Sequence, residues 1–183
     1  AIEIDSNYVD AHYNLAISLK DLSQLEEAVQ SYKKVIEINP NFAQAYNNLG
    51  NLYKELEQPS RAIENYKNAL KCNPNFAQAH NNLGNIFKDL EQTEKAIKSY
   101  KKAIEINPDS AEAHNNLGST LKGLRKLDDS LSYFMNAVSL KPNFAEAHFN
   151  LGNTFKESGD FESAIKHYQK AINIKPTYFQ AYC

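Results

Sequence analysis

Asparagine recurs at one fixed interval in this sequence, and its side chain could bind a peptide. Every 34 residues the same slot holds an asparagine: Asn14, Asn48, Asn82, Asn116 and Asn150. An asparagine amide carries two donor hydrogens and an acceptor oxygen, which match the acceptor and donor of a backbone peptide group. A ladder of such amides therefore predicts a surface that holds an extended peptide with little regard to its side chains.

Further polar rows repeat beside this ladder. Asparagines also stand one residue before and three residues after it, and a lysine follows three residues later. Spacings of three and four residues bring side chains to one face of a helix. The added candidates for peptide binding are Asn47, Asn81, Asn115, Asn51, Asn85, Asn153, Lys54, Lys88 and Lys122. The alternative is a polar face that is merely solvated, because asparagine is frequent throughout the chain.

The 34-residue period also predicts the elements that carry these rows. A fixed period of this size is typical of repeat arrays. Apolar residues fall at 3.6-residue spacing in two blocks per period, which predicts two helices, one over about the first 14 residues and one ending near residue 30. Each unit touches only its neighbours, so we expect one continuous domain. Its predicted units are 9–42, 43–76, 77–110, 111–144 and 145–178, with partial units at 1–8 and 179–183.

Each unit resembles the tetratricopeptide repeat (TPR). The second unit carries the pattern Tyr46, Leu49, Gly50, Tyr53, Ala62, Tyr66, Ala69 and Pro74, and the other units keep most of it. The resemblance implies an all-α fold, a right-handed α-solenoid of antiparallel helix pairs that forms a TPR-like superhelix. It also implies that the first helix of each pair lines a concave groove. A protein–protein interaction scaffold is the expected function, with a protein or peptide partner in extended conformation.

The first helix of the third unit supports a narrower resemblance. Residues 79–88 read AHNNLGNIFK, which is similar to helices in the repeat region of O-linked N-acetylglucosamine transferases, where asparagines form a ladder. This likeness implies the substrate-recruiting arm of a larger protein such as a glycosyltransferase. A catalytic domain would then lie only in an unseen parent chain.

A structural role is the alternative. The chain starts and stops inside a repeat, so a spacer or a self-associating array with no groove ligand is also consistent with the sequence. Ile165, Tyr168 and Ile172 could stack on the first helix of another copy. Such a head-to-tail contact tends to propagate instead of closing.

Several other functions are excluded by composition and spacing. The net charge is −2 and no long run of Lys or Arg occurs, so no nucleic-acid partner is expected. No apolar run is long enough for a membrane span, so no membrane partner is expected. No set of residues converges for catalysis, and we expect no catalytic residue, no metal ligand and no cofactor. The recurring histidines His12, His80, His114 and His148 are interpreted as a half-buried aromatic slot, and His167 is expected to be exposed.

The two cysteines favour an intracellular, cytoplasmic location. Cys72 occupies a slot filled elsewhere by Ile or Leu, which predicts a core position, and Cys183 ends the chain. More than three units separate them, so a disulfide between them is not expected. Free thiols suit a reducing compartment.

Finally, three local features are predicted from single positions. Asn41, Asn75, Asp109, Asn143 and Thr177 are expected to cap the first helix of a unit, because Gln or Glu follows three residues later. Glycines within these helices should allow close approach to the alanines Ala62, Ala96 and Ala164. The fourth unit has Ser130 instead of such an alanine and should be the least stable; its basic residues Lys122, Arg125 and Lys126 form a local positive spot.

Overall fold

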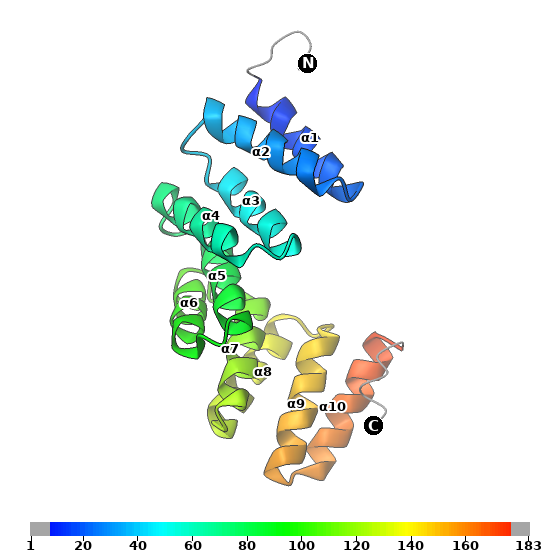
Figure 1. The fold of residues 1–183 in the computed structure, drawn as a ribbon. Helices are drawn as coiled ribbons and strands as arrows, with labels where there is room; N and C mark the ends of the chain where they lie inside the picture. Colours follow the sequence, from blue (N-terminus) through cyan, green and yellow to red (C-terminus); the bar gives the residue numbers. More distant parts are fainter. Residues whose placement is uncertain (1–7, 177–183) are drawn as a thin grey trace. The chain divides into compact units, whose positions relative to one another are not determined.

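Helices alone build the part of the chain that the structure describes. The computed structural model describes residues 8–176, which form ten helices and no strand, so the all-α prediction is confirmed (Figure 1). Across these residues, no helix combines the length and the apolar composition that a bilayer-spanning segment requires. The helices are α1 (Val9–Asp21), α2 (Leu25–Ile38), α3 (Ala43–Glu55), α4 (Pro59–Cys72), α5 (Ala77–Asp89), α6 (Thr93–Ile106), α7 (Ala111–Gly123), α8 (Leu127–Leu140), α9 (Ala145–Ser158) and α10 (Phe161–Ile174).

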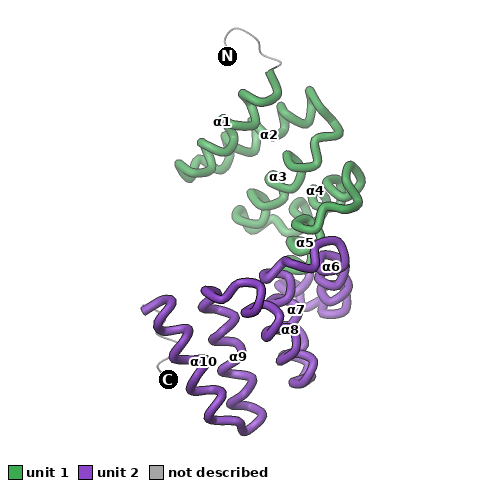
Figure 2. The backbone as a smooth tube through the Cα atoms, turned by 180° about the vertical axis from the view of Figure 1, so that it is seen from behind, with its two compact units in different colours: residues 1–86 green, residues 87–183 purple. Residues whose placement is uncertain are grey.

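The helices belong to two compact units, residues 1–86 and residues 87–183 (Figure 2). The first unit holds α1 to α4 and most of α5, and the second holds the end of α5 and α6 to α10. Within the units, α1 packs on α2, α3 on α4, α7 on α8 and α9 on α10, each pair running antiparallel. The odd-numbered helices are called A helices below, and the even-numbered ones B helices.

A left-handed residue reverses the chain after each A helix. In the first such turn Ser23 has φ 60°, and its N–H and that of Gln24 bond to the carbonyls of Lys20 and Leu19, both at 2.8 Å. These bonds satisfy carbonyls at the end of the helix that lack a partner within it. The equivalent residues of the later turns are Glu57 (φ 55°), Glu91 (57°), Arg125 (62°) and Gly159 (86°).

In each of the first four repeats, one aromatic ring of the B helix is fully buried between the helices. Tyr32, Tyr66, Tyr100 and Phe134 expose at most 1 % of their surface. Alanines of the B helices and leucines of the A helices are buried around them. Burying a ring of this size contributes about 2–3 kcal/mol, so the repeated ring dominates the stability of each pair.

The glycines of the A helices are needed because of these rings. Close approach is observed, but the predicted partner is wrong: a β-carbon added to Gly50 would lie 2.6 Å from Cε1 of Tyr66, and one added to Gly152 would lie 2.5 Å from Cε1 of Tyr168. The ring lies flat across the glycine, so a side chain there has no space. The spacing of apolar residues alone does not say whether the ring or the alanine faces the glycine.

The predicted helix caps are wrong. Helices α3, α7 and α9 have Phe42, Ser110 and Phe144 as their N-caps, one residue after the predicted ones. Asn41 instead donates its own N–H to Oδ1 of Asn39 at 3.1 Å, and this contact makes it part of the preceding turn. Asn75 and Asp109 bond in the same way to Asn73 and Asn107. Thr177 lies outside the described residues.

Cys72 is half-buried at the end of α4 and forms no disulfide. Its Sγ lies 3.6 Å from the carbonyl oxygen of Pro40, so it packs at the edge of the core instead of inside it. Cys183 and the predicted partial unit at 179–183 lie outside the described residues, as do residues 1–7 of the other partial unit.

Candidate peptide-binding site

The amide rows occupy one face of the A helices in each unit. Because the rows are spaced by three and four residues, a helix must place them on a common side. The first unit carries this face on α1, α3 and α5, and the second unit carries it on α7 and α9. The side chains of the 34-residue ladder are exposed at Asn14 and half-buried at Asn48, Asn82, Asn116 and Asn150.

The Asn48 amide is held by two tyrosines of the preceding helix pair. Its Nδ2 donates both hydrogens, one to the hydroxyl of Tyr13 at 3.0 Å and one to that of Tyr32 at 3.2 Å. Burial raises the pKa of Tyr32 to about 12, against a smaller lowering by the Asn48 hydrogen bond. The tyrosine hydroxyl is therefore neutral at physiological pH and available as an acceptor.

Asn82 makes the same type of contact one repeat later. Its Nδ2 donates to Oδ1 of Asn47 at 3.0 Å and to Oδ1 of Asn51 at 3.1 Å. In the second unit, Nδ2 of Asn150 donates to Oδ1 of Asn115 at 2.9 Å. Asn82 and Asn150 thus fix their donor groups on the preceding A helix, which orients the carbonyl oxygen away from that contact.

Two predicted contact residues are buried between helices. Asn47 and Asn115 expose only 1 % of their surface, so a ligand on the A face cannot reach them. Asn115 donates to Oε1 of Glu146 at 3.0 Å and accepts from Asn150, which satisfies its amide within the protein. Both residues position the ladder instead of forming its surface, while Asn81 in the equivalent slot of α5 is half-buried.

The asparagines three residues after the ladder accept hydrogen bonds from tyrosines of the B helices. The Tyr66 hydroxyl donates to Oδ1 of Asn51 at 2.8 Å, and the Tyr168 hydroxyl donates to Oδ1 of Asn153 at the same distance. Burial raises the pKa of the Tyr66 hydroxyl, which keeps it protonated as the donor. Sequence reasoning missed these tyrosines as part of the site. Their signal was present, since an aromatic residue recurs 15 positions after each of these asparagines.

The lysine row forms ion pairs between neighbouring repeats. Nζ of Lys20 lies 2.9 Å from Oε1 of Glu55, and Nζ of Lys122 lies 2.8 Å from Oε1 of Glu157. The other carboxylate oxygen of Glu157 is 3.8 Å from Arg125, so the predicted positive spot is offset by this acid. Lys88 donates to Oγ of Ser119 at 3.0 Å, and Lys54 is exposed.

A small polar hollow opens on the A face of the first unit, and we call it the A-face hollow. Its volume is about 160 Å³, and it lies beside the Asn82 amide. A volume of this size accommodates a peptide group or a few water molecules, and amides and ammonium groups surround it. The residues that line it are Lys20, Asn51, Lys54, Glu55, Tyr66, Asn82 and Asn85.

The recurring histidines bond to the backbone. Nε2 of His80, His114 and His148 lies 2.9–3.1 Å from the carbonyl oxygen of the proline six residues earlier, so Nε2 donates. His167 is not exposed as predicted: it is half-buried and stacks between His148 and Phe155, with centroids at 5.3 and 5.6 Å. Within the described residues, no three His, Cys, Asp or Glu side chains gather to hold a metal ion.

Paired helices with a shared amide-rich face define a helical-repeat protein of the interaction-scaffold class. Family models place it further: the TPR repeat model matches residues 18–57, 50–90 and 84–124, and tetratricopeptide repeat models match residues 1–30, 111–144 and 145–178. The chain therefore belongs to the tetratricopeptide repeat family, as the sequence pattern predicted. Proteins of this family bind protein or peptide partners, and their repeat fold is typically non-catalytic.

Solved structures share the fold of this chain. YrrB, described as a TPR protein with an unusual peptide-binding site, is 30 % identical over 100 % of this chain and 94 % of its own, with a TM-score of 0.73. PilF of Pseudomonas aeruginosa is 20 % identical over 94 % of this chain and 79 % of its own, with a TM-score of 0.87. The Cut9–Hcn1 assembly of APC/C gives 19 % identity over 99 % of this chain and 36 % of the matched chain, with a TM-score of 0.86. No curated protein sequence matches the chain.

Proposed function

We propose that the A face binds an extended peptide through the oxygens of the ladder asparagines. The observation that carries this proposal is the state of the Asn82 amide. Both of its hydrogens are used on Asn47 and Asn51, and no described residue donates to its Oδ1. The oxygen is therefore a fixed acceptor beside the A-face hollow, suited to a backbone N–H of a ligand.

Asn150 repeats this arrangement in the second unit. Its Nδ2 is held by Asn115, and among residues 8–176 no group donates to its side-chain oxygen. An acceptor that is already oriented loses little conformational entropy when a ligand binds, which favours affinity. An oriented acceptor oxygen is thus present in both units, which supports binding of a peptide along the A helices of the first or of the second unit.

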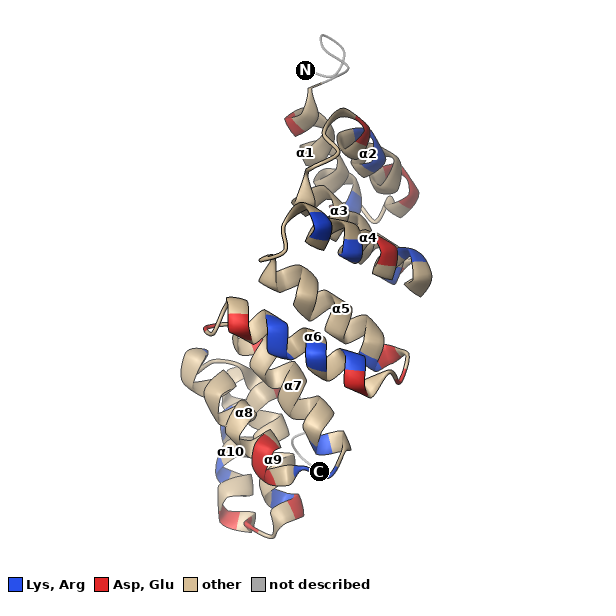
Figure 3. Ribbon diagram, turned by 90° about the vertical axis from the view of Figure 1, so that its left-hand side faces the viewer, with Lys and Arg blue, Asp and Glu red and all other residues tan. Residues whose placement is uncertain are grey.

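The charge distribution supports a ligand that is recognised mainly by its backbone. Charged residues gather on the B helices α4 and α6, whereas α5 carries them only at its C-terminal end (Figure 3). The lysines Lys20 and Lys122 at the edge of the A face are paired with acids, so their fields are partly neutralised. YrrB, whose description includes a peptide-binding site, is consistent with such a ligand. In a parent protein with a glycosyltransferase domain, this face would recruit the substrate segment.

A peptide selected from a random display library on the full chain provides the test. Replacement Asn82→Ala should weaken its binding about fivefold in calorimetry, since a neutral hydrogen bond contributes about 1 kcal/mol. The replacement Asn14→Ala should act similarly on peptides bound at α1. Asn14 is exposed, and its side chain forms no hydrogen bond within residues 8–176, so this second variant should disturb the fold little.

Asn136→Ala is the matched control, because Asn136 is an exposed asparagine on the B helix α8. Its affinity should equal that of the unmodified chain. Circular dichroism must show that every variant is folded, because Asn82→Ala also leaves the buried Asn47 without a donor. Equal affinity of the Asn82, Asn14 and Asn136 variants would exclude the ladder as the binding surface, as would failure of any library peptide to bind.

Self-association is the second candidate, and the exposed end of the last described helix favours it. Phe161 and Ile165 of α10 expose 64 % and 57 % of their surfaces, an apolar face of the kind that a following repeat covers. Tyr168 and Ile172, predicted to join this face, are half-buried, and Tyr168 bonds to Asn153. Sedimentation over a hundredfold concentration range decides this candidate: a constant monomer mass excludes it, and Phe161→Glu should abolish any association that is seen.

A further inference from the structure

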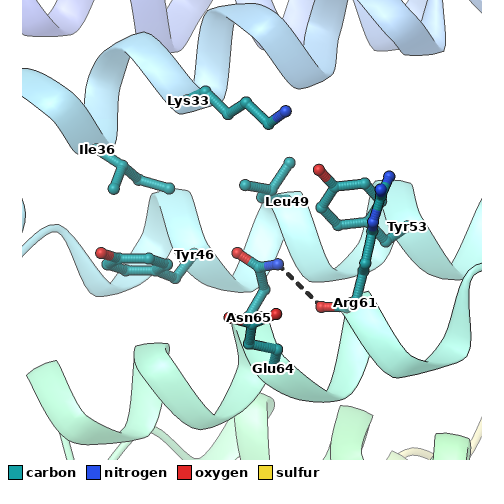
Figure 4. Close-up of a pocket in the computed structure, with 8 residues that line it drawn as sticks. All are labelled: Lys33, Ile36, Tyr46, Leu49, Tyr53, Arg61, Glu64 and Asn65. Carbon is teal, nitrogen blue, oxygen red and sulfur yellow. Dashed lines mark hydrogen bonds between the residues drawn. The ribbon is translucent and has the colours of Figure 1, made fainter.

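The first unit contains a second cavity, on the side of its B helices. It has a volume of about 350 Å³ and lies over α3 between α2 and α4 (Figure 4). This volume is in the range of small-ligand sites. We call it the outer pocket, and its lining residues are Lys33, Ile36, Tyr46, Leu49, Tyr53, Arg61, Glu64 and Asn65. None of them belongs to the amide ladder, so the outer pocket is separate from the proposed peptide face.

The fourth and fifth repeats show what can fill this place. In the fourth repeat Tyr133 of α8 covers His114 of α7, with ring centroids 5.8 Å apart. In the fifth repeat His167 of α10 lies between His148 and Phe155 of α9. An aromatic ring of the B helix therefore packs on the A helix at this position in both repeats of the second unit.

The second repeat lacks that ring, as do the first and third, whose equivalent residues are Ser31 and Ser99. The equivalent residue of the second repeat is Asn65, which is 92 % buried and turns back on its own helix, where Nδ2 donates to the carbonyl oxygen of Arg61 at 2.9 Å. Its short side chain leaves a cavity that Tyr46, Leu49 and Tyr53 line, and Figure 4 shows Leu49 between the two tyrosines. The slot that holds an aromatic ring in the fourth and fifth repeats is thus a cavity in the second, with an aromatic residue at either end.

The charges around the outer pocket favour a ligand that carries an acidic group next to an aromatic ring. Figure 4 shows the ammonium group of Lys33 and the guanidinium group of Arg61 toward the Tyr53 end, and Arg61 lies 5.5 Å above the Tyr53 ring. Lys33 forms no ion pair within the described residues, and the Arg61 guanidinium group donates to the neutral Gln58 amide at 2.7 Å and to no carboxylate there. Glu64 supplies one opposing charge, so two cations face one anion.

We propose that the outer pocket binds a partner segment in which an aromatic side chain adjoins an aspartate or glutamate. The ring enters the slot between Tyr46 and Tyr53, where aromatic pairs pack edge to face or offset. The neighbouring carboxylate pairs with Lys33 and Arg61. The hydroxyls of Tyr46 and Tyr53 have no hydrogen-bond partner within residues 8–176 and are free to bond to the backbone of the segment.

The test uses the full chain labelled with nitrogen-15 and a short blocked peptide in which aspartate precedes tryptophan. Titration followed by NMR should give saturable shifts of the Tyr46, Leu49 and Tyr53 amides. A peptide with asparagine in place of the aspartate should bind at least threefold more weakly. A peptide with alanine in place of the tryptophan should not bind. Shifts confined to α1 and α5, or none up to the solubility limit, would overturn the proposal.

The decisive variant is Asn65→Tyr, which copies the fourth repeat. Its own ring should fill the outer pocket, abolish peptide binding and leave the helical spectrum intact. Asn65→His, which copies the fifth repeat, provides the same test if the tyrosine variant does not fold. Lys33→Ala should weaken binding of the aspartate peptide at least threefold and leave binding of the asparagine peptide unchanged. Glu64→Gln should increase the affinity for the aspartate peptide about twofold, because it removes the opposing negative charge.

Asn82→Ala separates this proposal from the peptide face. Binding of the tryptophan peptide should be unchanged in that variant, because Asn82 lies on the A face. Unchanged binding in Asn65→Tyr would show that the peptide does not occupy the outer pocket. Equal loss in Lys33→Ala for both peptides would show that the carboxylate is not what Lys33 recognises, and either result overturns the proposal.

Discussion

The ring of Tyr66 occupies the place where a side chain on Gly50 would begin. A β-carbon there would lie 2.6 Å from Cε1 and 2.7 Å from Cδ1 of the ring. The ring cannot easily withdraw, because it is 99 % buried and its hydroxyl is held by Asn51. Glycine is thus required by packing between two helices of one repeat, and not by the backbone conformation of α3.

Replacement of this glycine should therefore destabilise the protein. Gly50→Ala forces the Tyr66 ring to move and should lower the free energy of unfolding by about 1–3 kcal/mol, the usual cost of overpacking. Gly123→Ala is the matched control, since no atom lies within 4 Å of a β-carbon built there. The Gly123→Ala change should raise the free energy of unfolding by up to about 1 kcal/mol, because alanine has a higher helix propensity than glycine. Urea denaturation measures both, and the same sign in both variants would refute the steric explanation.

The left-handed turns predict a stabilising change. Glu57 has φ 55°, a conformation that costs a residue with a β-carbon about 1 kcal/mol relative to glycine. The equivalent residue of the last turn is already Gly159, with φ 86°. Glu57→Gly should therefore raise the free energy of unfolding by about 0.5–1 kcal/mol. Glu64→Gly, in the middle of α4, should lower it by about 1 kcal/mol and serves as the control.

The buried Ser130 hydroxyl predicts a second stabilising change. Ser130 is 0 % exposed, and its Oγ has no hydrogen-bond partner. An unsatisfied buried polar group costs about 1–3 kcal/mol, so Ser130→Ala should raise the stability by about 1 kcal/mol. Ser132→Ala should change little, because Ser132 is exposed and bonds to the Asp128 carbonyl. Hydrogen exchange should be faster in residues 111–144 than in the other repeats and should slow there in Ser130→Ala.

Stability should depend on pH through His148 and His167. Their Nδ1 atoms are 3.0 Å apart, and since Nε2 of His148 donates to Pro142, Nδ1 of His148 accepts from His167. Burial lowers the pKa of both rings, that of His167 to about 4, and the nearby His148, Lys170 and Lys166 lower the His167 pKa further. The unfolded chain takes up these protons first, so stability present above pH 6.5 is lost as the pH falls toward 4.

The loss should be on the order of 1 kcal/mol for a half-buried ring screened by solvent. His167→Tyr copies Tyr133 of the fourth repeat and should remove much of this dependence while keeping the stacked packing. Urea midpoints at pH 7 and pH 5 compare the two chains. An equal fall in both would assign the pH dependence to other groups.

The repeat pattern was sufficient to predict the fold. A 34-residue period with two apolar blocks leaves two helices per repeat as the only arrangement that buries every block, and the tetratricopeptide assignment follows from the same residues. The ladder asparagines were also identifiable, because their spacing places them on one helix face whatever the details of packing. These conclusions depend only on position along a helix, which the sequence specifies.

Only the tertiary structure decided what each amide does. Asn47 and Asn48 are adjacent in sequence, yet one is buried between helices and the other bonds to two tyrosines. The outer pocket likewise depends on Asn65 folding back to Arg61, a choice of rotamer with no trace in the repeat pattern. Burial and hydrogen-bond partners depend on contacts between repeats. Because the repeats are nearly identical in sequence, the sequence alone does not distinguish which residue each contact buries.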